Sequence, residues 1–173
     1  MDIKLALERE HSKRNTEAIV NYIGNNPTLF AELMATFNTP NYRLTQRAAW
    51  PISYIAEHAP HLLNPYWDEI FVNLQKDMHP AFKRNIFRAL YRMKNIPEEI
   101  HGEVVEHCMQ AIADAKNPAA IRAFSIHIMG KMALLYPDLA NELYALIEPL
   151  TAHDLPSLKS SSKKILKQLS TLI

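Results

Sequence analysis

Apolar side chains recur along the chain with the spacing of an α-helix, in segments that each follow a proline. In the segment after Pro40, steps of four, four and three residues separate the apolar positions. Such steps keep side chains on one face of a helix. The same steps return in three later segments, which gives four matching helices, here called the B helices. Their stripes are Leu44, Ala48, Ile52 and Ile55; Phe82, Ile86, Leu90 and Met93; Ile121, Ser125, Met129 and Met132; and Leu158, Ser162, Leu166 and Leu169.

A second set of amphipathic segments, here called the A helices, alternates with the B helices. Proline suits the first turn of a helix, because its missing N–H would be unpaired there anyway. Asn26, Thr39 and Asn117 stand directly before prolines and are expected N-caps. The prolines that precede the A helices are Pro27, Pro60, Pro97 and Pro137.

Each A helix and the B helix after it form a predicted hairpin, over residues 27–58, 60–95, 97–135 and 137–173. The first stripe positions of successive B helices lie 38, 39 and 37 residues apart. Residues 1–24 are predicted to add one capping helix, from Ile3 to Ile23, with an exposed polar middle. A hairpin cannot bury its own stripe, so we expect the hairpins to stack into a single domain over residues 1–173. Leu169, Leu172 and Ile173 have no later repeat to cover them, which favours fraying or self-association through the C-terminal end.

Composition excludes several classes of function. The three glycines include no Asn-Gly or Asp-Gly pair, which argues against tight β-hairpins and against glycine-rich loops for phosphates or dinucleotides. The single cysteine, Cys108, cannot form an internal disulfide. The N-terminus turns polar too early for a signal peptide, and the most apolar stretch, residues 119–136, carries Arg122, His127 and Lys131. We therefore expect a cytoplasmic protein without a membrane span or a cofactor.

The repeat resembles the HEAT repeat in its length and in its alternation of two helices. The turns between A and B helices carry the acidic residue of that family as Asp77, Asp114 and Asp154. The basic residue early in the B helix stands at Lys83, Arg122 and Lys159. The resemblance implies an all-α fold, a right-handed α-solenoid of about four HEAT-like hairpins plus an N-terminal helix. It also implies that the B helices line a concave face.

Charge is segregated between the two sets of helices. The B segments hold thirteen Lys and Arg and one acid, Glu57, whereas the A helices and their turns hold thirteen acids and two lysines, Lys76 and Lys116. Together with the resemblance, this predicts a basic concave face that engages an acidic protein or a nucleic acid. The alternative is a solvated face whose charges are balanced by ion pairs, with the Asp of each turn pairing with the early basic residue of a B helix.

The candidate binding residues lie on this basic and aromatic face. Four of them share one side of the first B helix, at i, i+4, i+7 and i+11, where arginine and aromatic rings can hold a phosphate and stack on a base. The alternative is that the two aromatic rings pack against a neighbouring helix. The candidates are Arg43, Arg47, Trp50, Tyr54, Arg84, Arg88, Arg92, His127, Lys131, Lys163, Lys164 and Lys167.

A weaker similarity links the chain to HEAT-like proteins of the DNA alkylation-repair type, which use a basic concave face with tryptophans and an Asp. That similarity implies a DNA-binding glycosylase as the alternative function. This chain is shorter, and the only acid near Trp50 on the B helices is Glu57. Glu99, Glu103 and His107 form a helical row, but they do not make a metal motif. The sequence therefore favours a non-catalytic binding or scaffold module with no metal site.

Overall fold

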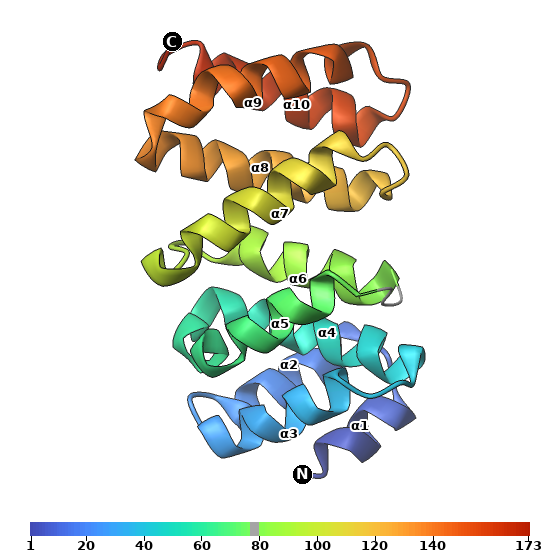
Figure 1. Ribbon diagram of the computed structural model, residues 1–173. Helices are drawn as coiled ribbons and strands as arrows, with labels where there is room; N and C mark the ends of the chain where they lie inside the picture. Colours follow the sequence, from blue (N-terminus) through green and yellow to red (C-terminus); the bar gives the residue numbers. More distant parts are fainter. Residues whose placement is uncertain (77–79) are drawn as a thin grey trace. The chain divides into compact units, whose positions relative to one another are not determined.

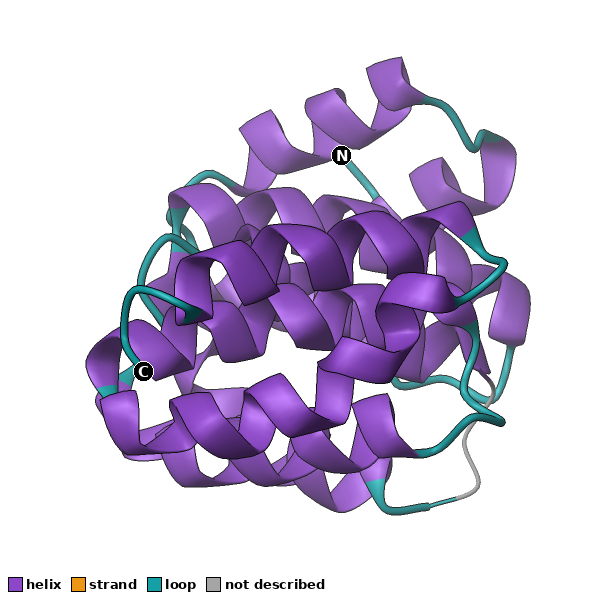
Figure 2. Ribbon diagram, turned by 90° about the horizontal axis from the view of Figure 1, so that it is seen from above, coloured by secondary structure: helices purple, strands orange, loops and turns teal. Residues whose placement is uncertain are grey.

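A computed structural model describes residues 1–76 and 80–173, and these residues are helical, with no β-strand among them (Figures 1 and 2). Asp77 of the expected turn series lies outside the described residues. The chain divides into two compact units, residues 1–95 and 96–173. Whether all the helices form one domain stays a prediction. Among the described residues, no helix is long and apolar enough to cross a membrane.

The first unit contains six of the α-helices labelled in Figure 1. A 3₁₀ turn over Pro60–Tyr66 precedes α5, so that this A helix begins only at Trp67. Within the unit, α4 packs against α1, α2, α3 and α6. The six helices are α1 (Ile3–Arg9), α2 (Lys13–Ile23), α3 (Pro27–Phe37), α4 (Tyr42–His58), α5 (Trp67–Leu74) and α6 (Pro80–Arg92).

The second unit contains two hairpins, in which α8 packs against α7, α9 and α10. Short 3₁₀ turns over Glu98–Ile100 and Pro137–Leu139 replace the expected first turns of its A helices. A third 3₁₀ turn, Glu148–Ala152, follows α9. The helices are α7 (His101–Ala113), α8 (Ala119–Leu135), α9 (Ala140–Ile147) and α10 (Pro156–Leu169).

The predicted stripes form the core of each unit. Every stripe position of α4, α6 and α8 is buried, including Ser125, whose hydroxyl donates to the carbonyl of Ile121. On α10, Leu166 remains half-buried. Cys108 is fully buried on α7, and burial raises the pKa of its thiol well above the usual range, as expected for a structural side chain. Leu169 is also buried within its unit, while Ile173 is exposed, so self-association through this end stays a prediction.

The N-terminal segment forms two helices where the sequence predicts one. Ser12 caps α2 by accepting from the backbone N–H of Asn15 at 3.1 Å. The Asn15 amide donates to the carbonyls of Ala6 and Glu10, both at 2.9 Å, and so ties the end of α1 to the start of α2. The polar middle of the N-terminal segment is therefore a turn between α1 and α2. Asn15 supplies donors for carbonyls that the end of α1 leaves without a partner in the helix.

The helix starts agree only in part with the expected caps. Asn26 caps α3, with Pro27 in its first turn, as predicted. The cap of α4 is Asn41 rather than Thr39, and its side chain accepts from the N–H groups of Arg43 and Leu44. Asn117 is not a cap, because its amide donates back to the carbonyl of Ala111.

Gly24 and Gly102 offer a matched test of this fold. Gly24 ends α2 at φ +50° and ψ −119°, a conformation that a Cβ disfavours. We expect Gly24→Ala to lower the free energy of unfolding by about 1–3 kcal/mol. Gly102 is helical, and an added Cβ would meet no atom within 4 Å. Gly102→Ala should raise stability by about 0.5 kcal/mol. Urea unfolding followed by circular dichroism measures both, and equal effects of the two changes would contradict the assigned backbone.

Candidate functional site

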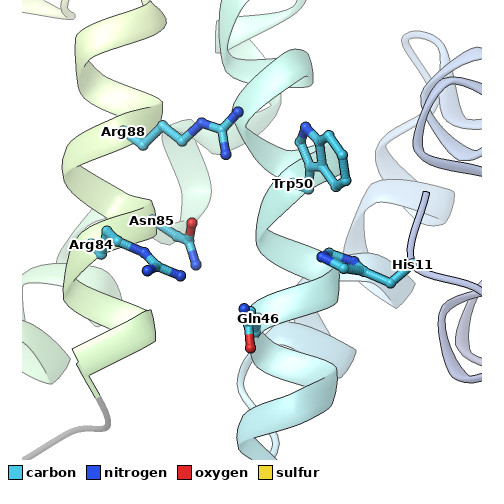
Figure 3. A pocket seen from close by; sticks show the side chains of 6 residues that line it. All are labelled: His11, Gln46, Trp50, Arg84, Asn85 and Arg88. Atoms are coloured by element: carbon cyan, nitrogen blue, oxygen red, sulfur yellow. The ribbon is translucent and has the colours of Figure 1, made fainter. Parts of the chain in front are cut away.

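A pocket of about 170 Å³ opens in the first unit between α4, α6 and the turn after α1 (Figure 3). Gln46 and Trp50 come from α4 and lie one helical turn apart. Arg84, Asn85 and Arg88 come from α6. The turn adds the His11 imidazole. These six side chains line the pocket, and none of them is a carboxylate.

Two arginines give the pocket its positive charge, and the part of the chain that the structure describes offers no ion-pair partner for either of them. Arg84 is exposed, whereas Arg88 is half-buried. Burial, and after it the charge of Arg92, lowers the pKa of the Arg88 guanidinium, with a smaller contribution from Arg84. A guanidinium stays protonated at neutral pH even so. The pocket therefore presents two fixed positive charges to any group that enters it.

Neutral donors surround these charges. The Trp50 indole Nε1 is buried and has no hydrogen-bond partner, and it faces the Arg88 guanidinium across the pocket (Figure 3). The Asn85 amide donates to the carbonyl of Ala81 at 2.7 Å, which uses one of its two N–H groups. Two donors that face each other cannot satisfy one another. The arrangement is therefore complementary to an acceptor that carries negative charge.

His11 closes the pocket beside Trp50. The two rings meet edge to face, with centroids 5.2 Å apart. Burial, and then the charge of Arg47, lowers the pKa of the His11 imidazole below its usual value. His11 is therefore neutral at pH 7 and adds a polar edge without a third charge. Trp50 is thus half-buried against His11, with its Nε1 still facing the pocket.

Tyr54, the second predicted aromatic residue of α4, contacts an arginine within the unit. The Arg92 guanidinium lies 4.3 Å from the centroid of the Tyr54 ring, a cation–π arrangement. The same guanidinium donates from Nε to Glu57 Oε2 at 2.8 Å and forms an ion pair with it. Glu57, the single acid of the B helices, is therefore held by Arg92 and does not line the pocket beside Trp50.

Arg47 supports the N-terminal hairpin. Its Nη1 donates to the carbonyls of Leu7 and Glu8, both at 2.8 Å. These carbonyls belong to the last turn of α1, where a helix leaves acceptors unpaired and favours a cation. Arg43, one turn earlier on α4, is exposed. The four predicted residues of this helix thus differ in role: Arg43 is exposed, Arg47 caps α1, Trp50 lines the pocket and Tyr54 contacts the Arg92 guanidinium.

In the second unit, α8 and α10 bring together His127, Lys131 and Lys164. Burial, then Lys164 and then Lys131, lowers the pKa of His127, while burial lowers the pKa of Lys131. His127 Nε2 and the Ser161 hydroxyl form a hydrogen bond of 3.0 Å. Lys163 and Lys167 are exposed on α10. This unit therefore holds a second cationic cluster, separate from the pocket beside Trp50.

The expected ion pairs between turn and B helix do not form at the hairpin of α7 and α8. Asp114 accepts from the backbone N–H of Lys116 at 2.9 Å. Arg122 is buried, and its Nε donates to the carbonyl of Ile112 at 3.0 Å. Both residues thus satisfy backbone groups of the turn. The alternative in which each turn Asp neutralises a basic residue is wrong for this hairpin.

Sequence reasoning found three of the six pocket residues and missed His11, Gln46 and Asn85. A signal existed for Asn85, which is a polar residue directly beside the buried stripe of α6 and between two arginines. No periodic signal marks His11, because it lies in a turn and reaches the pocket only through the packing of α2 on α4. Among the described residues, no group of three or more His, Cys, Asp or Glu side chains could hold a metal ion.

Comparison with known proteins identifies the class. The family described as the HEAT repeat domain matches residues 3–169, so the chain belongs to the HEAT repeat family and has its all-α solenoid fold. Two crystal structures of engineered proteins are similar in fold, with TM-scores of 0.64 and 0.62 and sequence identities of 14% and 11%. Each match covers 98% of this chain and 80% of the other chain. No curated protein matches.

The glycosylase alternative finds no support in these comparisons. Such chemistry commonly uses a carboxylate to stabilise developing positive charge or to direct a water, and the six residues that line the pocket include none. The pocket that contains Trp50 is lined by cations and neutral donors, and Glu57 is paired with Arg92. The arrangement suits the binding of an anion.

Variants of Arg47 and Arg43 compare an arginine that binds α1 with an exposed arginine on the same helix. Arg47→Ala removes two charge-assisted hydrogen bonds to α1 and should lower the free energy of unfolding by about 1–3 kcal/mol. Arg43→Ala removes an exposed side chain and should change it by less than about 0.5 kcal/mol. Thermal and urea unfolding of the two variants provide the test. A neutral Arg47→Ala would show that this arginine does not hold α1.

Proposed function

We propose that the chain is a non-catalytic binding module whose B helices engage an anionic partner, an acidic protein or a nucleic acid. A HEAT repeat fold supports a binding or scaffold role in general. The observation that carries the finer proposal is the pocket of the first unit, which holds Arg84 and Arg88 and no carboxylate. Arg92, one turn further along α6, differs from both because it is paired with Glu57.

Electrostatic attraction supplies the driving force in this proposal. Each phosphate or carboxylate that a Lys or Arg neutralises releases condensed counterions or structured solvent, so affinity depends steeply on salt. The second unit contributes through its own cluster of Lys131 and Lys164 and through the exposed Lys163 and Lys167. The single acid of the B helices, Glu57, is already paired and does not repel the partner.

A salt titration tests this function with labelled duplex DNA, single-stranded RNA and an acidic peptide. The wild-type chain should bind at least one of them at low salt. The logarithm of its association constant should fall linearly with the logarithm of the salt concentration. Lys164→Gln combined with Lys167→Gln should reduce the magnitude of this slope for duplex DNA by about 2. Each lost phosphate contact reduces it by about 0.9.

The matched control is Lys4→Gln combined with Lys116→Gln, which lowers the net charge equally but alters exposed lysines outside the B helices. It should leave the slope nearly unchanged. An equal decrease of the slope in both double variants would show that only the net charge of the chain matters, which would contradict a role for the B helices. Failure of all three ligands to bind at low ionic strength would overturn the proposed function.

A further inference from the structure

The size of the pocket beside Trp50 restricts what it can hold. The pocket measures about 170 Å³. Pockets that enclose drug-sized ligands or cofactors occupy about 300–1,000 Å³. A complete nucleotide or cofactor therefore does not fit inside. A single small anionic group at the end of a larger molecule does.

The donors of the pocket favour phosphate over carboxylate. They come from three chain segments, namely α4, α6 and the turn that carries His11. A carboxylate presents two oxygens in one plane, whereas a phosphate monoester presents three free oxygens in a tetrahedral arrangement and a charge near −2. The two guanidinium groups of Arg84 and Arg88 match that charge. The Trp50 indole N–H adds a neutral donor from the opposite wall (Figure 3).

The surroundings of the pocket favour a nucleic acid as the carrier of this phosphate. The B helices of the first unit contain seven Lys and Arg, against the single acid Glu57. Beyond the pocket, Arg43 and Lys94 are exposed in the same unit. A nucleic-acid strand brings one further negative charge with each nucleotide, so neighbouring cations gain partners as the strand continues. A singly phosphorylated peptide brings its charge only at one point.

We propose that the pocket lined by Trp50, Arg84 and Arg88 binds the terminal phosphate monoester of a nucleic-acid strand. This inference rests on the proposed function and names the group that the first unit recognises. The two guanidinium groups hold the phosphate oxygens, and the Trp50 N–H holds one of them from α4. An internal phosphodiester has only two free oxygens and one negative charge, so it leaves donors of the pocket unpaired. The strand end is therefore preferred over the middle.

The experiment compares oligonucleotides of one sequence that carry a 5′-phosphate, a 3′-phosphate or hydroxyl groups at both ends. At least one phosphorylated end should bind about tenfold more tightly than the unphosphorylated strand, since charge-assisted hydrogen bonds are gained. The preferred end identifies the source of the phosphate. Titration with inorganic phosphate, followed by amide chemical shifts, should perturb residues around Trp50 and Arg88. Equal affinity for all three strands would overturn the inference.

Three variants test whether the preference for a phosphorylated end depends on the pocket. Arg84→Gln alters an exposed side chain and should abolish the preference for a phosphorylated end without unfolding the chain. Trp50→Phe keeps an aromatic ring but removes the indole N–H together with one of the two fused rings, and should reduce the preference several-fold. Arg14→Gln makes the same charge change at an exposed residue of α2, outside the pocket lining, and should keep the preference. A preference that survives Arg84→Gln and Trp50→Phe, or disappears in Arg14→Gln, would contradict the assigned pocket.

A phosphoserine peptide and its unphosphorylated form distinguish the carrier. Tighter binding of the phosphopeptide than of either phosphorylated strand would overturn the assignment to a nucleic acid. The outcome is separable from that of the proposed function. If unphosphorylated strands bind with a steep salt dependence and the terminal phosphate adds nothing, the binding module stands and the terminal-phosphate site fails. If inorganic phosphate perturbs the pocket while no strand and no acidic peptide binds, the binding module and the assignment to a strand end both fail.

Discussion

The burial of one apolar stripe on each B helix is the constraint on which the remaining structure depends. In the first unit α4 is covered by α1, α2, α3 and α6, and in the second α8 is covered by α7, α9 and α10. A helix packed on several sides leaves only a narrow strip for charged groups. On α6, which packs against α4 and α5, Arg84 and Arg88 lie one turn apart beside the buried Asn85. The packing that hides the stripe therefore also gathers the charges.

The core of each unit could be predicted because helical periodicity is a local property. Phe82, Ile121 and Leu158 are each buried as their spacing requires. Helix ends were less predictable, because several polar residues near a start compete to cap it, as Thr39 and Asn41 do. The break between α1 and α2 depends on bonds from Asn15 and Arg47, and the second of these residues lies about 40 residues away in the sequence. Periodicity contains no information about such partners.

The candidate site was predictable only as a set of residue types on a face. Arg47, Arg88 and Arg92 look equivalent in the sequence, since each is an arginine on a B helix. In the structure the first caps α1, the second lines the pocket and the third pairs with Glu57. Their roles differ because their partners come from other segments, and His11 enters the site in the same way. Fold and charge are encoded locally, whereas the use of each charge is decided by packing.

The arginines of α6 show where stability has not been maximised. Arg84, Arg88 and Arg92 follow one another at intervals of four residues, and like charges at that spacing each destabilise a helix by a few tenths of a kcal/mol. Glu57 and the Tyr54 ring offset this cost for Arg92. Arg84 and Arg88 face a pocket that offers further donors and no acid among its lining residues. Local departures from what folding favours mark the places where a chain interacts with something else. The proposed anion site beside Trp50 follows from applying this criterion to the first unit.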